Sequence, residues 1–423
     1  MRAEPFSTVI EKSGNRIARD IEVLSGPEYT TSSEAIRRYA YTGAYERTLS
    51  YFDAELRKVG FEVVRDPVGN LVARNRPPGE PVFGIGSHCD SNRNGGRFDG
   101  TLGVVAALEL CRLNAERGLG LPIQLISWLE EEGSGFGELM LGSRIAAGLV
   151  TQRDLDAMRA LDDGMSFMEQ ARAAGFEPER WRDSRHVLDD LAGWIEIHIE
   201  QGRVLQDAGI PIGLVTAITG YIHADLVITG RADHAGGTPM TGRIDAGVIA
   251  AETVLAVERL TQVAGDGTVG TVGQLVFEPG LRNVIPGRAT VALDIRSVDQ
   301  GQLTSVVEST IELARSSAAA RGAAVEVVEH QRQPPTQMDA DLVVALEACA
   351  KRLDVPTLRM ASGAAHDTVF VAERVPSAMV FVPCKDGISH SPAEDARPAD
   401  AALAVEVALG SIRDRLRASE SLS

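Results

Sequence analysis

The sequence predicts an α/β protein built around a mostly parallel sheet, with a smaller α+β domain inserted into it. Short apolar runs alternate with helical periodicity up to about residue 130 and again after about residue 330, and this alternation is typical of a parallel sheet. The intervening residues alternate apolar and polar side chains, which predicts antiparallel strands. We therefore expect a discontinuous domain of residues 1–211 and 330–423, interrupted by a domain of residues 212–329.

The first domain begins with helical periodicity over residues 33–60. A hairpin is expected next, because the turn-forming sequence DPVGN at residues 66–70 lies between two β-branched runs. Buried strands are predicted at residues 81–88 and 123–129, with a helix at residues 101–116 between them. This order of strand, helix and strand is the repeating unit of a parallel sheet.

The later elements follow the same two patterns. Residues 150–190 predict short, interrupted helices, and WIEIHIE at residues 194–200 predicts a strand with alternating faces. Alternating strands at residues 212–236 and 289–298 belong to the inserted domain. Further helices are predicted at residues 244–262, 301–321 and 340–352, and a further strand near residues 378–382.

Composition narrows the function classes. The formal net charge of -17 argues against a protein that binds nucleic acid or anionic lipid by charge. The four cysteines form no C-x-x-C pair, which argues against a disulfide framework and favours a reducing compartment. The sequence contains neither a signal-peptide pattern nor a membrane-spanning run. We therefore expect a cytoplasmic protein whose partners include neither nucleic acid nor membrane.

Residue types that bind metals gather at the predicted strand ends. His88 ends one strand, and Glu131 and Glu132 follow the next. His198 lies on a third strand, and His390 follows a fourth. Because the carboxyl ends of parallel strands meet at one edge of a sheet, these side chains are expected to converge. Histidine and carboxylate ligands together suit zinc, manganese, cobalt or nickel.

Two aspartates extend this group. Asp90, two residues after His88, is placed to orient the imidazole. A glycine pair permits a tight loop that returns Asp99 to the same place, where its carboxylate can bridge two metals about 3.5–4 Å apart. Each piece alone also fits an ordinary turn or strand end, and only their coincidence at four strand ends predicts a metal site. Spacing alone does not separate ligand from base within Glu130–Glu132.

A series of motifs resembles those of the M20-type amidases. In order they are HCDSNRNGGRFDG, EEEGSGFG, HIEQG, HAGGTPM, NVIPG with DIR, SGAAHD and GISHSPAE. They are most similar to the hydantoinase/carbamoylase branch, which contains N-carbamoyl-L-amino-acid hydrolases, allantoate amidohydrolases and β-ureidopropionases. The resemblance runs from about residue 60 to residue 395. It implies a dinuclear-metal catalytic domain in a two-domain subunit that forms a homodimer through the smaller domain.

The resemblance also implies two divalent metal ions per subunit, zinc or else manganese, cobalt or nickel. The implied ligands are His88 and His198 for one ion, Glu132 and His390 for the other, and Asp99 as the bridge. Glu131 is implied as the general base, which takes a proton from the attacking water and passes it to the leaving nitrogen. Asp90 and His234 complete the implied catalytic set, with His234 stabilising the oxyanion when the domains close.

The branch binds the carboxylate of its substrate at positions matched here by Asn283 and Arg296, and arginine is suited to bidentate carboxylate binding. These two residues and His234 lie in the inserted domain. We therefore expect residues of roughly 212–329 to form a mobile lid that also carries the dimer contact. The remaining expected pocket residues are Gln201, Gly363 and Ala364.

The predicted reaction is hydrolysis of an N-carbamoyl-L-amino acid or a related ureido acid, a small molecule with a free carboxylate. Departures from the usual residues of the branch at Asn92, Arg93, Gly135 and Ala365 leave the substrate open. The alternatives are another carboxylate-bearing amide (allantoate, an N-acyl amino acid or a dipeptide), hydrolytic deamination on the same metal core, and a non-catalytic, metal-bound scaffold dimer. His366-Asp367 matches an HD pair of the family, with either a structural or a substrate-binding role.

Overall fold

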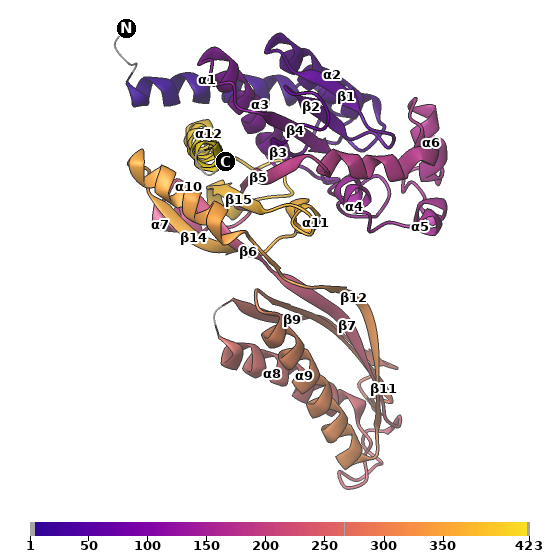
Figure 1. Cartoon of the computed structure of the whole chain (residues 1–423). Coiled ribbons are helices and arrows are strands. Elements are labelled where there is room, and N and C mark those ends of the chain that lie inside the picture. Colours follow the sequence, from indigo (N-terminus) through magenta and orange to yellow (C-terminus); the bar gives the residue numbers. More distant parts are fainter. Residues whose placement is uncertain (1–4, 266, 421–423) are drawn as a thin grey trace. The chain divides into compact units, whose positions relative to one another are not determined.

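A computed structural model describes residues 5–265 and 267–420, and within it the chain forms two compact units (Figure 1). Unit 1 contains the residues up to Thr216, residues 338–360 and the residues from Ala365 onward. Unit 2 contains residues 217–337 together with residues 361–364. The boundary expected at residues 329/330 falls inside β12 (Ala324–Gln333), an edge strand of the unit 2 sheet, so this boundary lies later in the chain than the sequence suggested.

Unit 1 is built on a mixed sheet whose central strands are parallel. Its strands run in the order β1-β2-β4-β3-β5-β15-β6-β13, where β13 is Thr336–Gln337, and β14 also pairs with β6. The pairs β4–β3, β3–β5 and β5–β15 are parallel, and the outer pairs are antiparallel. The bounds are β1 Glu62–Arg65, β2 Leu71–Arg74, β3 Val82–His88, β4 Ile123–Trp128, β5 Leu191–Ile199, β6 Ile212–Ile218, β14 Thr357–Ser362 and β15 Ser377–Val382. The prediction of a mostly parallel central sheet is confirmed.

Helices cover this sheet. The bounds are α1 Phe6–Leu24, α2 Gly43–Lys58, α3 Thr101–Glu116, α4 Leu141–Ala147, α5 Gln152–Ala157, α6 Phe167–Ala173, α7 Val204–Ala208, α10 Ala340–Arg352, α11 Thr368–Val371 and α12 Pro398–Glu420. Helices α1, α3 and α12 pack against one another, and α3 and α12 also pack against central strands. Among the described residues, no helix is both long enough and apolar enough to cross a bilayer.

The helix predicted at residues 33–60 is partly wrong. α2 begins only at Gly43, where the Thr42 side chain accepts a hydrogen bond from the Tyr45 N–H and so caps the helix. Residues 33–42 are not helical, because their backbone groups bond to other loops of unit 1, as at the isolated bridge between Ile36 and Gly95. The helix predicted at residues 101–116 is confirmed as α3.

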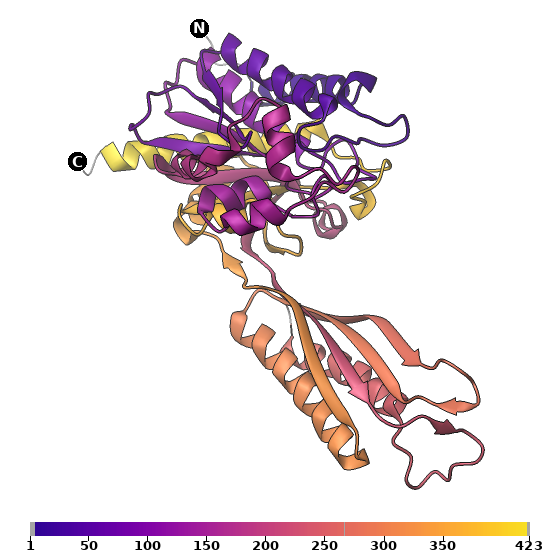
Figure 2. The same cartoon turned by 90° about the vertical axis from the view of Figure 1, so that its right-hand side faces the viewer.

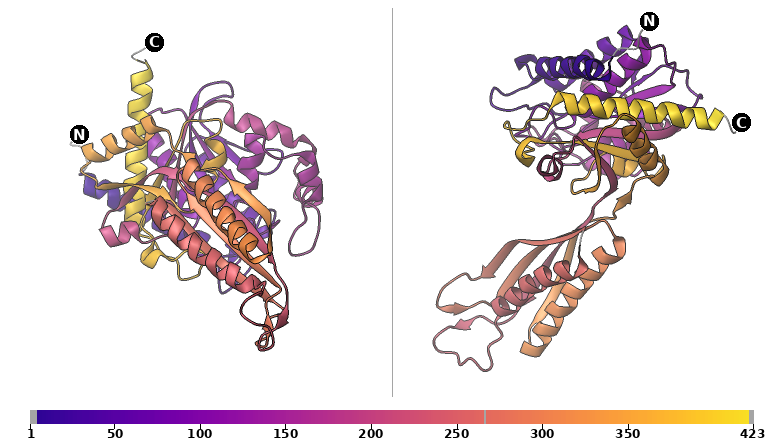
Figure 3. Two further views of the ribbon diagram at one scale, coloured as in Figure 1. Left: turned by 90° about the horizontal axis from the view of Figure 1, so that it is seen from below. Right: turned by 90° about the vertical axis from the view of Figure 1, so that its left-hand side faces the viewer.

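Unit 2 is an antiparallel sheet covered by two helices. Its strands run in the order β12-β7-β11-β9 and form one twisted layer (Figure 2). Helices α8 (Ala246–Ala264) and α9 (Gln300–Arg321) lie side by side against this sheet (Figure 3). The strand bounds are β7 Gly220–Thr229, β9 Thr268–Glu278 and β11 Arg288–Ser297. The short strands β8 (Asp233–His234) and β10 (Val284–Ile285) pair with each other.

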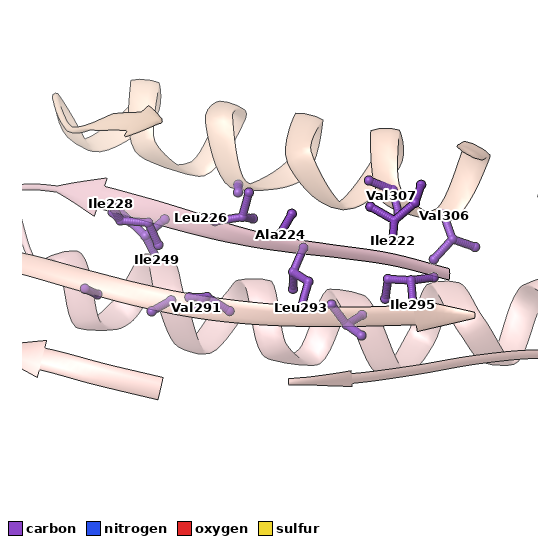
Figure 4. Close-up of a cluster of buried hydrophobic side chains, with 14 of the residues drawn as sticks. Ile222, Ala224, Leu226, Ile228, Ile249, Val291, Leu293, Ile295, Val306 and Val307 are labelled. Carbon is purple, nitrogen blue, oxygen red and sulfur yellow. The ribbon is translucent and has the colours of Figure 1, made fainter. Parts of the chain in front are cut away.

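The core of unit 2 follows from the alternation in its sequence. Every second residue of β7 and β11 is buried, and these side chains point toward the helices (Figure 4). The buried cluster includes Ile222, Leu226, Val291, Leu293 and Val307. Burying such side chains contributes roughly 1.5–3 kcal/mol each, which is enough to hold a two-layer unit together.

Candidate functional site

The predicted metal ligands of unit 1 lie at or just after the ends of the central strands, at one edge of the sheet. His88 is the last residue of β3, and Glu131 and Glu132 follow the end of β4. His198 lies near the end of β5, and the loop after β15 carries His390. Because these four strands are parallel neighbours, their carboxyl ends meet, as the sequence predicted.

Two groups of metal-ligand atoms share Asp99. One group contains His88, Asp99 and His198, and the other contains Asp99, Glu132 and His390, with the ligand atoms of each group within 4.8 Å of one another. His198 Nε2 lies 3.2 Å from Asp99 Oδ1, and His390 Nε2 lies 3.3 Å from Asp99 Oδ2. The two oxygens of one carboxylate therefore face the two groups, which is the arrangement that a bridging ligand requires.

Hydrogen bonds to nearby carbonyl oxygens orient the imidazole rings of His88 and His198. His198 Nδ1 lies 2.9 Å from the Ile199 carbonyl oxygen, and His88 Nδ1 lies 3.3 Å from the carbonyl oxygen of Asp90. A carbonyl can only accept, so each Nδ1 carries the proton and each Nε2 presents its lone pair. This tautomer is the one that binds a metal through Nε2.

Asp90 does more than the sequence suggested. Its carboxylate lies 3.4 Å from His88 Nδ1, consistent with the predicted orienting contact. The same carboxylate accepts hydrogen bonds from the backbone N–H groups of Glu131 and Glu132, at 3.2 and 3.0 Å. The buried Asp90 side chain therefore fixes the loop that follows β3 relative to the loop that follows β4.

The three consecutive glutamates have different environments. Glu130 is fully buried, and its carboxylate accepts backbone N–H groups from Ala40, Gly135 and Phe136. The Glu130 carboxylate therefore has a structural role, because it binds the backbone of these three residues. Glu131 Oε2 lies 3.6 Å from His88 Nε2, and Glu132 Oε2 lies 3.4 Å from His390 Nε2. This geometry disfavours Glu130 as base or ligand, a choice that spacing alone left open.

Three side chains support Asp99 and its loop, and two of them, Ser389 and Glu394, were not predicted from the sequence. Ser389 Oγ and Gln201 Nε2 donate to Asp99 Oδ2 at 2.7 and 2.8 Å. Glu394 Oε1 accepts the N–H groups of Phe98 and Asp99 at 2.7 and 2.9 Å. Ser389 and Glu394 flank His390 in the motif GISHSPAE, so the motif contained the signal. Gln201 was predicted as a substrate residue, and in unit 1 it contacts the predicted bridging carboxylate.

Two glycines allow this close packing. A Cβ at Gly100, which has a φ of +60°, would lie 2.3 Å from the His88 ring. A Cβ at Gly96 would lie 2.4 Å from the Glu394 side chain. Both distances are far below van der Waals contact, so any larger residue would displace a ligand or its support.

The donor set fits divalent cations. Burial raises the pKa of Glu131 well above its usual range, and the neighbouring carboxylates of Glu132 and Asp367 add to the effect while His88 opposes it. Burial likewise raises the pKa of Glu132 to about 7, with Asp99 adding and His390 opposing. Crowded, buried carboxylates of this kind are stabilised as ligands by a cation between them. Mixed histidine and carboxylate donors suit zinc, manganese, cobalt or nickel.

His366 lies behind this group and not in it. Its ring packs edge-on against His198, with ring centroids 4.5 Å apart. His366 and His198 form a third group of possible metal ligands with Glu196. However, the Glu196 carboxylate already accepts hydrogen bonds from Ser87 and Thr368, at 2.7 and 2.6 Å. These contacts favour a structural role for His366, one of the two roles left open by the sequence.

Two of the four departures from the family pattern, Gly135 and Arg93, have local explanations. A Cβ at Gly135 would lie 2.9 Å from the Glu130 carboxylate oxygens, so a larger residue at that position would displace Glu130. Arg93 donates to Asp162 at 2.7 Å and to the Ser134 carbonyl at 3.0 Å. The backbone N–H of Asn92 donates to Glu132 Oε1 at 3.1 Å, a contact that any residue except proline can make. Nothing in the structure explains Ala365.

In unit 2, His234 and Asn283 are brought together. β8 pairs with β10, and the Ala235 N–H donates to the Asn283 carbonyl at 2.9 Å. The N–H groups of Gly236 and Gly237 donate to His234 Nδ1, at 3.1 and 2.9 Å. The neutral His234 ring therefore carries its proton on Nε2, where it can donate to an oxyanion. The His234 side chain is exposed.

Arg296 is partly engaged already. Its Nε and Nη2 donate to Asp294, each at 3.0 Å, and its Nη1 donates to the Gly363 carbonyl at 3.1 Å. A guanidinium has five donors, so two N–H groups at its outer end remain for a carboxylate. The sequence reading missed Asp294, although two-residue spacing on β11 places it on the same face as Arg296. Gly363 and Ala364 belong to unit 2 and not to the metal-binding unit, contrary to expectation.

Comparison with known proteins gives concordant matches. Residues 84–414 match the model of peptidase family M20/M25/M40. The chain is 37% identical to an N-carbamoyl-L-amino-acid amidohydrolase of Paenarthrobacter aurescens, covering 92% of this chain and 94% of that protein. It is 30% identical to the allantoate amidohydrolase of Bacillus subtilis, covering 90% and 92%. A hydantoinase/carbamoylase family amidase from Burkholderia ambifaria superposes with a TM-score of 0.84 at 34% identity, covering 95% of this chain and 97% of that one.

Proposed function

The chain belongs to the M20/M25/M40 peptidase family, and we propose that it hydrolyses an N-carbamoyl-L-amino acid to the free amino acid, carbon dioxide and ammonia. It is a metal-dependent hydrolase of carbon–nitrogen bonds other than peptide bonds, as its relatives are. The observation that carries the proposal is the pair of donor groups that share Asp99, with Glu131 beside them. The reaction balances with one water. The oxygen of the water bonds to the ureido carbon, the bond from that carbon to the amino-acid nitrogen breaks, and a proton of the water goes to that nitrogen. The carbamic acid released decomposes to carbon dioxide and ammonia.

We propose two divalent ions per subunit. His88 and His198 would hold one ion, Glu132 and His390 the other, and Asp99 both. When bound, the ions supply a water of lowered pKa and stabilise negative charge on the substrate oxygen. Asp90, Gln201, Ser389 and Glu394 keep these ligands in place through the hydrogen bonds described above.

Glu131 is the proposed general base. Its side chain is 10% exposed and lies beside the donor group, where an attacking water would be within reach. Its backbone N–H donates to Asp90, and this contact fixes the backbone from which the Glu131 side chain extends. Glu131 takes the proton from water and then delivers it to the leaving nitrogen, so one carboxylate serves as base and then as acid.

Unit 2 is the proposed substrate lid. Arg296, steadied by Asp294, offers its two outer N–H groups to the substrate carboxylate, and Asn283 adds an amide donor. His234 offers Nε2–H to the developing oxyanion. These residues are remote from the ligands in sequence, so in this proposal they act only when the lid closes, which also excludes water.

We also propose that unit 2 forms the homodimer contact. β9 is an edge strand, and it exposes Leu275, Val276 and Phe277 at 40%, 40% and 39%. An apolar edge strand of this kind is a template for pairing with another strand. Pairing with a second copy would cover these side chains and continue the sheet.

Allantoate is the second candidate substrate, because one relative is an allantoate amidohydrolase. The deciding experiment assays N-carbamoyl-L-amino acids, allantoate, N-acyl amino acids and dipeptides with the same metal-loaded preparation. Both ammonia and free amino acid are measured, because N-acyl amino acids and dipeptides release an amino acid without ammonia. The proposal expects the highest kcat/KM with a carbamoyl amino acid. Turnover of allantoate, an N-acyl amino acid or a dipeptide alone would overturn the proposed substrate while leaving the metal site intact.

A further inference from the structure

Residues 36–41, here called the strap, bind the loops that carry the predicted metal ligands. The Ile36 N–H donates to the Gly95 carbonyl at 3.1 Å, and the Ser91 N–H donates to the Arg38 carbonyl at 3.0 Å. The Ala40 N–H donates to Glu130 Oε2 at 3.2 Å. The strap therefore contacts the loop between His88 and Asp99 and also the buried glutamate that precedes Glu131.

Ser91 strengthens this connection from the side of the ligand loop. Its hydroxyl donates to the Ile36 carbonyl at 2.9 Å and accepts the Arg38 N–H at 3.1 Å. The strap and the ligand loop are thus joined by side chain as well as backbone. These contacts explain why residues 33–42 leave the helix that their sequence periodicity predicts.

Arg38 is the centre of the strap. It is 1% exposed, and its guanidinium donates to carbonyl and hydroxyl oxygens. Nε donates to the Cys89 carbonyl at 2.7 Å, and Nη2 donates to Thr101 Oγ1 at 2.7 Å. Nη1 donates to the Leu24 carbonyl at 2.9 Å and approaches Thr48 Oγ1 at 3.3 Å. A buried arginine whose donors are satisfied by neutral oxygens is a costly feature, because desolvating its charge is unfavourable.

Two of the oxygens that Arg38 binds, the Cys89 carbonyl and Thr101 Oγ1, lie on the backbone segments that carry the predicted metal ligands. Cys89 lies between His88 and Asp90, and Thr101 is the first residue of α3, two positions after Asp99. The planar fork of Arg38 holds both at fixed spacing. It thereby fixes the backbone that carries two members of one donor group, one of which is the shared carboxylate.

We propose that Arg38 is a positioning residue for the metal centre, acting through the Cys89 carbonyl and the Thr101 hydroxyl to set the spacing of His88 and Asp99. The proposal rests on the proposed metal centre.

The test is Arg38→Lys in the full-length protein, which keeps the charge but removes the fork. The matched control is Arg47→Lys, an exposed arginine on α2 that donates to the Glu28 carbonyl. Each protein is stripped of metal and titrated with Co²⁺, and the visible absorption spectrum reports ligand geometry. We expect Arg38→Lys to alter the spectrum and to weaken Co²⁺ affinity about 10- to 100-fold, with a fall in kcat and little change in KM.

Thr101→Val provides a second variant, because it removes the hydroxyl that accepts a hydrogen bond from Arg38 Nη2 and leaves the buried charge in place. We expect the same spectral change with a smaller loss of affinity, and this result decides the matter if Arg38→Lys does not fold. Wild-type spectra and affinities in the folded variants would overturn the role of Arg38. A wild-type protein that binds two Co²⁺ ions but hydrolyses no carbamoyl substrate would instead overturn the proposed substrate and leave the positioning role standing.

Discussion

The predicted metal ligands in unit 1 and the predicted substrate residues in unit 2 are held very differently. His88 and His198 are each 1% exposed and Asp99 is 5% exposed, and hydrogen bonds fix each of them. In unit 2, His234 and Asn283 are exposed, and Arg296 is 35% exposed. His390, whose side chain is 49% exposed, is the exception among the predicted ligands. The other ligands of unit 1 form a preorganised site, whereas the groups of unit 2 remain open to solvent.

This difference has an energetic meaning. Preorganised ligands pay their ordering cost during folding, so that metal binding and the chemistry that follows need little rearrangement. The exposed groups of unit 2 are ordered only when substrate binds, and the carboxylate contact can then be used to drive closure. Changes in unit 1 should accordingly affect kcat and metal content, whereas changes in unit 2 should depend on the substrate.

Metal removal should have the largest effect, because it disables the preorganised site entirely. Dialysis against a chelator is expected to abolish ammonia release, and added zinc, manganese, cobalt or nickel to restore it. Metal content per subunit measured alongside activity should rise to two ions as activity returns. A metal-free preparation with full activity would contradict the proposed centre.

Glu131→Gln should have the next largest effect. The amide keeps the shape but cannot accept a proton, so kcat is expected to fall about 10²–10⁴-fold while both metals stay bound. The matched control is Glu138→Gln, a glutamate of the same loop region that pairs with Arg144 at the surface. Near-normal kcat in Glu131→Gln would mean that another group is the base.

Arg296→Ala tests the open site of unit 2. Loss of a charged, hydrogen-bonded partner typically costs 2–5 kcal/mol, so kcat/KM for a carboxylate substrate should fall on the order of 10²-fold. A substrate whose carboxylate is amidated should be affected much less, because that contact is already missing. Arg288→Ala, on the same strand and 52% exposed, is the control. Equal losses on both substrates would show that Arg296 is structural.

A change in β9 should have the smallest effect on activity and a clear effect on assembly. Replacing Phe277 by Lys puts a charge on the exposed apolar edge, so sedimentation is expected to shift from dimer toward monomer. Val64→Lys, an exposed valine of β1 in unit 1, controls for a general effect on solubility. A wild-type protein that sediments as a monomer would remove the basis of the dimer proposal.

The sequence determined the architecture of unit 1 and the residues that converge in it. Apolar runs in the sequence predict the buried strands that end at His88 and shortly before Glu131. The carboxyl ends of neighbouring parallel strands lie at the same edge of their sheet. That rule alone brings together ligand residues that are some 300 positions apart, from His88 to His390. The helix at residues 101–116 was likewise fixed by local periodicity.

Tertiary structure decided what depends on contacts between distant segments. The periodicity of residues 33–42 is helical, but their backbone bonds to the ligand loop and to Glu130 instead. The roles of Glu130 and Glu131 were inseparable in sequence, and they differ because only Glu130 is enclosed by backbone N–H groups. Arg38 carried no sequence signal at all, because a buried arginine looks like any other until the oxygens around it are known. Local pattern reports which face of an element is apolar, but the partners of a polar group are set by the whole fold.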